Sequence, residues 1–249
     1  RYSIPALKKL QKKYPKLNIL VGASTYKLYN NQEERSSTAR QINNSDVFYD
    51  VYNSAVFISK DEEVKIYHKT KLVPGAEKTP FPKLFDKLAA VMINLGGISG
   101  SLGSAPTNHV FDVNNYIIKP LICYESVYGD LGSINSNLIS IITNDGWWKN
   151  TSGYKQHFSY ARLRAVEQRK SIVRSANTGL SGFIDKNGDI IKRSNWDEKV
   201  VLQHTVSINN KQTFYSIYGD YIGRVSLFFA LTLIMIVCVK RRVSINNYS

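Results

Sequence analysis

The sequence predicts an α/β sandwich followed by one C-terminal transmembrane helix. Short apolar runs are separated by hairpin turns or by helical stretches, and the chain ends in a long apolar segment with a basic stop. The runs are continuously apolar, which is typical of sheets that are covered on both faces. With 249 residues, 43% of them hydrophobic, the chain is long enough for one large domain.

The first part of the chain predicts one helix and three strands. In residues 5–14, leucines recur among lysines as they do in an amphipathic helix. The apolar run 17–23 predicts a buried strand, and the polar stretch 29–44 predicts a loop. Residues 51–59 and 64–68 flank a charged turn and predict a β-hairpin.

The second part of the chain predicts more strands and two helices. Residues 81–103 lack a clean period and predict a helix followed by a surface loop. Residues 153–170 predict a helix on which Phe158, Ala161, Ala165 and Val166 share a face. The remaining elements are strands at 117–122, 138–143, 171–175 and 200–208, and a hairpin across 182–192 with Asn187-Gly188 as its turn.

Cys123 stands where the apolar strand 117–122 gives way to polar residues, a suitable place for a nucleophile. A cysteine attacks as its thiolate, so it needs a base or a positive neighbour. The four histidines show no spacing that identifies a partner for Cys123, and none that suggests a zinc site. A carboxylate base with a lysine ammonium is another solution, and the N–H of Tyr124 could donate to an oxyanion. An inert buried cysteine is the alternative reading.

The apolar tail predicts how the chain meets a membrane. Residues 221–239 approach the roughly 20 residues that a bilayer requires, if Arg224 extends to the surface. The basic residues 240–242 follow directly, so we expect residues 240–249 in the cytoplasm and residues 1–220 outside it. A buried helix of a soluble protein is the alternative.

The formal charge of +14 comes from basic residues that are scattered along the chain. No nucleic-acid-reading motif accompanies them, so we expect no nucleic-acid partner. They fit either a solvated surface or a domain that lies against anionic lipid. The two cysteines cannot form a disulfide framework.

Three stretches together identify a family. They are YHKTKLVPGAE around Lys69, ICYES around Cys123, and ITNDGWWKNTSGYKQH with the ARLRAVEQRKSIVRSANTG that follows. The chain resembles the nitrilase (carbon–nitrogen hydrolase) superfamily, and within it the apolipoprotein N-acyltransferases. The resemblance implies a nitrilase-like αββα sandwich and a Glu-Lys-Cys site without metal or cofactor.

The resemblance also implies roles for residues. Lys69 and Cys123 match the lysine and the nucleophile, and Glu77 matches a further glutamate in the lysine loop. Tyr124 and Glu125 match the residues after the nucleophile and would support the site or its oxyanion. Cys123 would take an acyl chain from a phospholipid as a thioester. The α-amino group of a diacylglyceryl-cysteine in an apolipoprotein would then accept it.

The same resemblance implies the bacterial inner membrane, and the basic stop puts the catalytic domain on the periplasmic side. We also expect a monomer. The chain departs from the family pattern in two respects. The base glutamate belongs to a Pro-Glu motif upstream of the position of Arg1, and Glu33 and Glu34 do not match it. The family also has several transmembrane helices before this domain, and this sequence shows none there. We therefore expect the domain 1–220 to be N-terminally incomplete, and this chain alone to show little or no turnover.

Several residues keep two readings. Glu77 is either a surface carboxylate or the partner of Lys69. Glu125 is either catalytic support or one half of a salt bridge to Arg164 or Arg174.

Three aromatic residues also keep two readings. Trp147 and Trp148 belong to the core or an interface, or they contact acyl chains. Phe81, with Leu84 and Phe85, forms a lipid-facing lid or packs in the ordinary way.

Two other functions use the same residues. A nitrilase-type amidase would release its acyl group to water, and a non-catalytic fragment would only bind lipid. The apolar tail favours the acyltransferase, because an amidase of small molecules does not need a membrane span.

Overall fold

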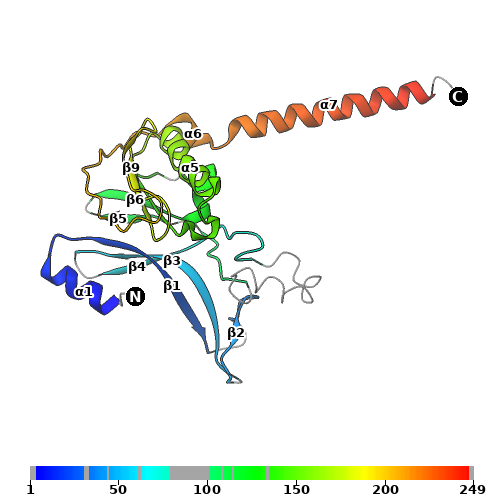
Figure 1. Ribbon diagram of the computed structural model, residues 1–249. Helices are drawn as coiled ribbons and strands as arrows, with labels where there is room; N and C mark the ends of the chain where they lie inside the picture. Colours follow the sequence, from blue (N-terminus) through cyan, green and yellow to red (C-terminus); the bar gives the residue numbers. More distant parts are fainter. Residues whose placement is uncertain are drawn as a thin grey trace.

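Two β-sheets face each other and form the centre of the molecule (Figure 1). The computed structural model describes residues 4–30, 34–43, 45–60, 63–78, 101–107, 109–113, 115–132 and 135–246. The predicted helix and loop at 81–103 therefore lie almost wholly outside the described residues.

The first sheet is built around one long strand, β3. The elements of this part are helix α1 (Ile4–Lys13) and strands β1 (Ile19–Tyr29), β2 (Arg40–Gln41), β3 (Phe48–Ile58) and β4 (Val64–His68). Strand β3 pairs antiparallel with the other three strands, which makes it the most buried strand of this sheet. The predicted hairpin is confirmed, whereas β1 is longer than predicted and β2 lies in the predicted loop.

The second sheet has six strands in the order β10-β9-β8-β7-β6-β5. Their bounds are β5 Phe111–Val113, β6 Tyr116–Ile122, β7 Leu138–Thr143, β8 Ile172–Ala176, β9 Gly182–Ile184 and β10 Ile190–Arg193. Strands β6, β7 and β8 are parallel, so their carboxyl ends meet at one edge of the sheet. Cys123 follows β6 directly at this edge.

Helix α5 (Ser152–Gln168) connects β7 to β8 and packs on the second sheet (Figure 1). Of the four residues predicted to share its buried face, Phe158, Ala161 and Ala165 are in the core, while Val166 is exposed. A second cluster joins the two sheets and consists of Ala55, Phe57, Tyr67, Phe111 and Ile122. The fold is thus the predicted α/β sandwich.

The predicted strand at 200–208 is wrong, because this segment pairs with no strand in the part of the chain that the structure describes. Val201 is 92% exposed. The backbone here is held by isolated bonds: the Ser171 hydroxyl donates to the carbonyl of Ser207 at 2.9 Å, and Asn209 N–H donates to the carbonyl of Asn137 at 3.4 Å. Extended backbone of this kind resembles a strand in sequence but forms no ladder.

The chain ends in helices α6 (Phe214–Tyr218) and α7 (Tyr221–Asn246). Helix α7 projects away from the sandwich (Figure 1). Within it, Tyr221–Arg241 is long and apolar enough to cross a membrane, with a mean hydropathy of 2.4, and its most apolar part is not buried in the protein. This exposure does not fit the alternative of a buried core helix.

Candidate active site

Cys123 occupies a sharp turn between strand β6 and the short 3-10 helix η1 (Cys123–Val127). Its φ is +52°, in the left-handed region that residues other than glycine rarely adopt. Such a conformation is unfavourable by about 1–3 kcal/mol and is concentrated at functional sites. The thiol is free and half-buried, so Cys123 is not fully buried.

Lys69 follows β4 and is completely buried. Its Nζ lies 2.8 Å from both carboxylate oxygens of Glu77. Asn53 Nδ2 and the backbone N–H of Val73 also donate to this carboxylate, at 2.6 and 2.8 Å. Glu77 therefore orients Lys69 and is not a free surface carboxylate.

Glu125 connects the lysine loop to the cysteine turn. Its buried Oε1 accepts hydrogen bonds from Tyr67 Oη at 2.9 Å and from Thr70 N and Oγ1 at 2.7 and 2.8 Å. Its Oε2 accepts from Ile122 N–H at 2.8 Å. The residues beside Lys69 and Cys123 are thus bound to one carboxylate, which brings the two sequence-predicted residues together between the sheets.

The predicted salt bridge from Glu125 to Arg164 or Arg174 is wrong. Arg164 contacts Glu167 at 3.1 Å, and Arg174 contacts Asp145 at 2.8 Å. The reason is the layering of the fold: these arginines lie on α5 and on the side of β8 that faces α5, whereas Glu125 points toward the first sheet.

A second buried lysine, Lys119, lies close enough to Glu125 to be affected by its charge, and it was not predicted from the sequence. Its Nζ is 4.9 Å from the centre of the Tyr67 ring and donates to the carbonyl of His109 at 3.2 Å. Burial lowers the pKa of Lys119 to about 8, although the charge of Glu125 acts in the opposite direction. Burial and the charge of Glu125 also raise the pKa of Tyr67, so its hydroxyl stays protonated and donates.

The other sequence-predicted residues are spread around the turn. Tyr124 is half-buried, with its ring edge on Tyr128 at 5.6 Å, and its N–H comes directly after the nucleophile. Trp147 and Trp148 lie in the 3-10 helix η2 (Asp145–Trp148), 56% and 42% exposed, so the core reading of these residues is wrong. Phe81 lies outside the described residues.

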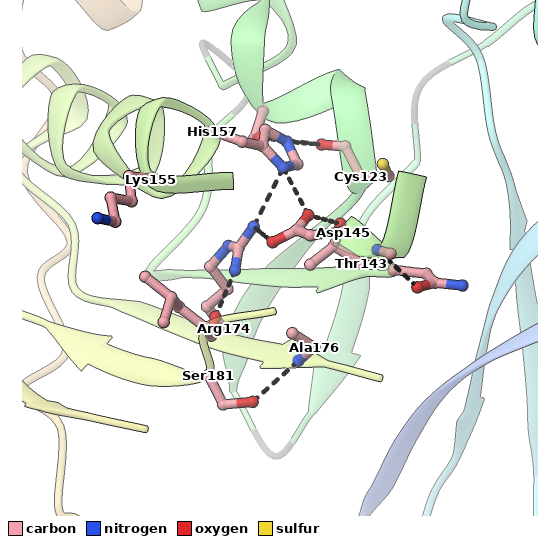
Figure 2. A network of polar contacts seen from close by, with 12 residues as sticks. Cys123, Thr143, Asp145, Lys155, His157, Arg174, Ala176 and Ser181 are labelled. Atoms are coloured by element: carbon pink, nitrogen blue, oxygen red, sulfur yellow. Dashed lines mark hydrogen bonds and ion pairs between the residues drawn. The ribbon is translucent and has the colours of Figure 1, made fainter. Parts of the chain in front are cut away.

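A buried polar network on the α5 side of the sheet was also missed (Figure 2). His157 Nδ1 lies 2.8 Å from Asp145 Oδ1, and Arg174 Nη2 lies 2.8 Å from Asp145 Oδ2. Burial alone would raise the pKa of Asp145, but bonds from His157 and Arg174 hold it below its ordinary value. The available signal was weak: Asp145 follows a parallel strand, and His157 lies on the buried face of the next helix.

Within the described ranges, no cluster of three His, Cys, Asp or Glu side chains could hold a metal ion. The site offers instead a strained cysteine, a buried ammonium and a backbone N–H. These groups suit nucleophilic attack on an acyl carbon followed by stabilisation of the oxyanion.

Comparison with protein families shows which family the chain belongs to. The family described as carbon-nitrogen hydrolase matches residues 5–214. The chain belongs to the carbon–nitrogen hydrolase family. The fold of this hydrolase domain is similar to that of Saccharomyces cerevisiae Nit3, a member of branch 10 of the nitrilase superfamily. That comparison has a TM-score of 0.52 and 15% identity, and covers 79% of this chain and 62% of the other.

A carbon-nitrogen hydrolase from Helicobacter pylori G27 is also similar in fold. It has a TM-score of 0.50 and 10% identity, over 77% of this chain and 62% of the other.

Curated relatives are more similar in sequence. Apolipoprotein N-acyltransferase of Chlorobaculum tepidum is 30% identical over 203 residues, which cover 78% of this chain and 38% of the relative. That of Rhodopseudomonas palustris is 33% identical over 195 residues, covering 76% of this chain and 36% of the relative. The hydrolase domain thus spans a little over a third of the length of these relatives.

Proposed function

We propose that this carbon–nitrogen hydrolase domain transfers an acyl chain from a phospholipid to the α-amino group of diacylglyceryl-cysteine in apolipoproteins. The observation that carries the proposal is the bond set of Glu125, which brings the Lys69 loop to the strained turn of Cys123. The names of the relatives supply the apolipoprotein acceptor and the N-acyl transfer, and the family resemblance supplies the phospholipid donor. Acyl transfer requires no cofactor in this scheme.

The chemistry has two steps on Cys123. The thiolate attacks the ester carbonyl of the donor, and the oxyanion is stabilised by the Lys69 ammonium and Tyr124 N–H. The base glutamate of the site takes the thiol proton before the attack and returns it to the leaving oxygen, so the intermediate collapses to a lysophospholipid alcohol and a thioester on Cys123. The acceptor amine then attacks the thioester and releases the thiol. Lys69 and Cys123 are two members of the Glu-Lys-Cys site that the family resemblance implies, and neither Glu33 nor Glu34 matches its base glutamate.

The membrane arrangement follows from α7. We place Tyr221–Arg241 across the bacterial inner membrane, because it has the required length and hydropathy. Basic residues at its end favour the cytoplasmic side for residues 240–249, which puts the hydrolase domain in the periplasm. Exposed Trp147 and Trp148 are suited to contact acyl chains near the membrane surface. A single copy of the protein carries the described site residues, consistent with a monomer.

The decisive experiment uses the full-length parent protein in detergent. After incubation with phosphatidylethanolamine, mass spectrometry should find the mass of one acyl chain on the peptide that contains Cys123. Cys123→Ala should abolish the adduct, whereas Cys238→Ala, a control in α7, should retain it. Absence of an adduct in the natural protein, or full activity of Cys123→Ser, would refute the proposal.

Adding a diacylglyceryl-cysteine peptide separates the alternatives. The acyltransferase should move the acyl chain to the peptide amine. An amidase should instead release free fatty acid at the same rate with or without the peptide.

A further inference from the structure

The peptide groups before and after Cys123 are held in place by hydrogen bonds. The turn has a left-handed backbone at a residue other than glycine. Glu125 fixes the N–H of Ile122, before the nucleophile, at 2.8 Å. The carbonyl oxygen of Cys123 accepts a hydrogen bond from Ser126 Oγ in the same turn at 2.9 Å. The same carbonyl is held from the opposite layer by His157 Nε2 of α5 at 3.1 Å (Figure 2).

That carbonyl shares a planar peptide group with the N–H of Tyr124. In a trans peptide the C=O and the following N–H point in opposite directions. A donor that fixes the Cys123 carbonyl on the α5 side therefore aims the Tyr124 N–H away from α5. Hydrogen bonds that share a peptide group also strengthen one another, so a donor on the oxygen makes the N–H a better donor.

His157 is held rigidly for this role. Its Nδ1 lies 2.8 Å from Asp145 Oδ1, and that carboxylate is held by Thr143 Oγ1 at 2.9 Å and by Arg174 Nη2 at 2.8 Å. Arg174 is fixed in turn by its bond to the carbonyl of Leu180. All four polar side chains are buried, from the end of β7, from α5 and from β8 (Figure 2).

The geometry does not favour His157 as the base for the thiol. A carbonyl oxygen only accepts hydrogen bonds, so Nε2 carries the proton in its bond to Cys123, while Ser126 Oγ, which donates to the same carbonyl, lies 3.1 Å from Nε2. Nδ1 lies 2.8 Å from Asp145 Oδ1 and 3.1 Å from Arg174 Nη2. Among the described contacts, both ring nitrogens are thus occupied by partners other than the Cys123 sulfur.

We infer that the Asp145–His157 pair is the positioning device of the oxyanion site. His157 orients and polarises the Cys123–Tyr124 peptide so that the Tyr124 N–H can stabilise the tetrahedral intermediate. This inference deepens the proposed acyl transfer and rests on it for the reaction, but it applies to any acyl donor that Cys123 attacks.

Two isosteric variants test the inference in the full-length protein. In His157→Gln the amide nitrogen replaces Nε2 and can still donate to the Cys123 carbonyl. In His157→Asn the amide nitrogen replaces Nδ1, so it reaches Asp145 but not the carbonyl. His204→Asn, an exposed histidine beside Phe183, is the matched control.

The first readout is acylation of Cys123 by p-nitrophenyl butyrate, followed by mass spectrometry and release of p-nitrophenol. His157→Asn should slow acylation at saturating ester by about 10- to 100-fold, somewhat less than the loss of a whole oxyanion donor. The half-saturating ester concentration should change by less than about twofold, because the lost interaction belongs to the transition state. His157→Gln should recover most of the rate, and His204→Asn should match the natural protein.

The second readout is alkylation of Cys123 by iodoacetamide. This reaction forms a carbon–sulfur bond and expels iodide without creating an oxyanion, so its rate should be nearly equal in all four proteins. Parallel loss of alkylation and acylation in His157→Asn would overturn the inference, as would equal acylation rates for the Gln and Asn variants. If the natural protein reacts with the ester but never with phospholipid, the proposed lipid function fails while the inference stands.

Discussion

Glu125 accepts a hydrogen bond from the hydroxyl of Tyr67 at 2.9 Å, across the interface between the two sheets. Tyr67 lies on β4 of the first sheet, and Glu125 lies in the turn after β6 of the second. The same carboxylate binds the amides of Thr70 and Ile122. The relative position of the lysine and the nucleophile therefore depends on one buried side chain.

Removing that carboxylate should destabilise the whole domain. Glu125→Ala leaves buried donors of Tyr67, Thr70 and Ile122 without their acceptor, which should cost about 3–5 kcal/mol of unfolding free energy. For a domain of this size the melting temperature should fall by roughly 10 °C. The control is Glu63→Ala, which breaks an exposed pair with Lys65 and should cost less than about 1 kcal/mol. Equal melting temperatures for the two variants would contradict the role of Glu125.

Glu77→Gln should slow the acylation of Cys123 more strongly than its effect on the stability of the fold would suggest. The change leaves the buried ammonium of Lys69 beside an amide that offers one acceptor and no charge. Lys69 should then move from the position where it faces the oxyanion, and acylation of Cys123 should slow by about 10²-fold. Asp130→Asn, in an exposed 3.8 Å pair with Lys71, should leave the rate unchanged. A Glu77→Gln rate within twofold of the natural protein would refute this role.

Lys119 should make stability rise with pH. Its pKa is lowered by burial to about 8 in the folded protein, whereas an unfolded lysine titrates near about 10.4. Below the lower value both states are protonated and the folded state carries a buried charge. Between the two values only the unfolded chain holds the proton, so the free energy of unfolding increases, by up to roughly 3 kcal/mol.

Lys119→Met isolates that effect. Melting temperatures of the natural protein and the variant, measured from about pH 7 to about pH 10, should converge or cross as the pH rises. Other groups titrate equally in both proteins and cancel in the difference. Parallel curves would show that Lys119 does not titrate in this range.

Alanine substitutions at two glycines with positive φ distinguish the cost of backbone strain from the cost of a steric clash. At Gly179, with φ +129°, an added Cβ would collide with the carboxylate of Asp145; at Gly219, with φ +66°, it would meet no atom within 4 Å. Gly219→Ala should cost about 1 kcal/mol from its backbone alone. Gly179→Ala should cost about 2 kcal/mol more, because it also disturbs a packed, buried ion pair. Similar melting temperatures would mean that the Asp145 network tolerates displacement.

The features that were predicted correctly from the sequence depend on residues that lie close together in the chain. Strand β7 has the predicted bounds, and Cys123 does end a strand, because an apolar run that meets polar residues is a local signal. The Lys69–Glu77 pair also lies within one short loop. Such features require no knowledge of which strands become neighbours.

The rest depended on contacts between distant segments. Most partners of Glu125 come from the end of β4 and the loop after it, 54 to 58 residues earlier in the chain, whereas the expected arginines lie on the wrong side of the sheet. His157 reaches the carbonyl of Cys123 across 34 residues. The segment 200–208 has strand-like residues, yet it pairs with no strand among the described residues.

The left-handed backbone of Cys123 places the nucleophile where glycine would be the more comfortable residue. Selection for thermal stability alone would thus tend to replace Cys123, the nucleophile of the proposed reaction. Such a trade-off between stability and activity is common at the active sites of proteins. A library of variants selected only for heat resistance should accordingly accumulate Cys123→Gly. These variants should be more stable to heat but catalytically inactive.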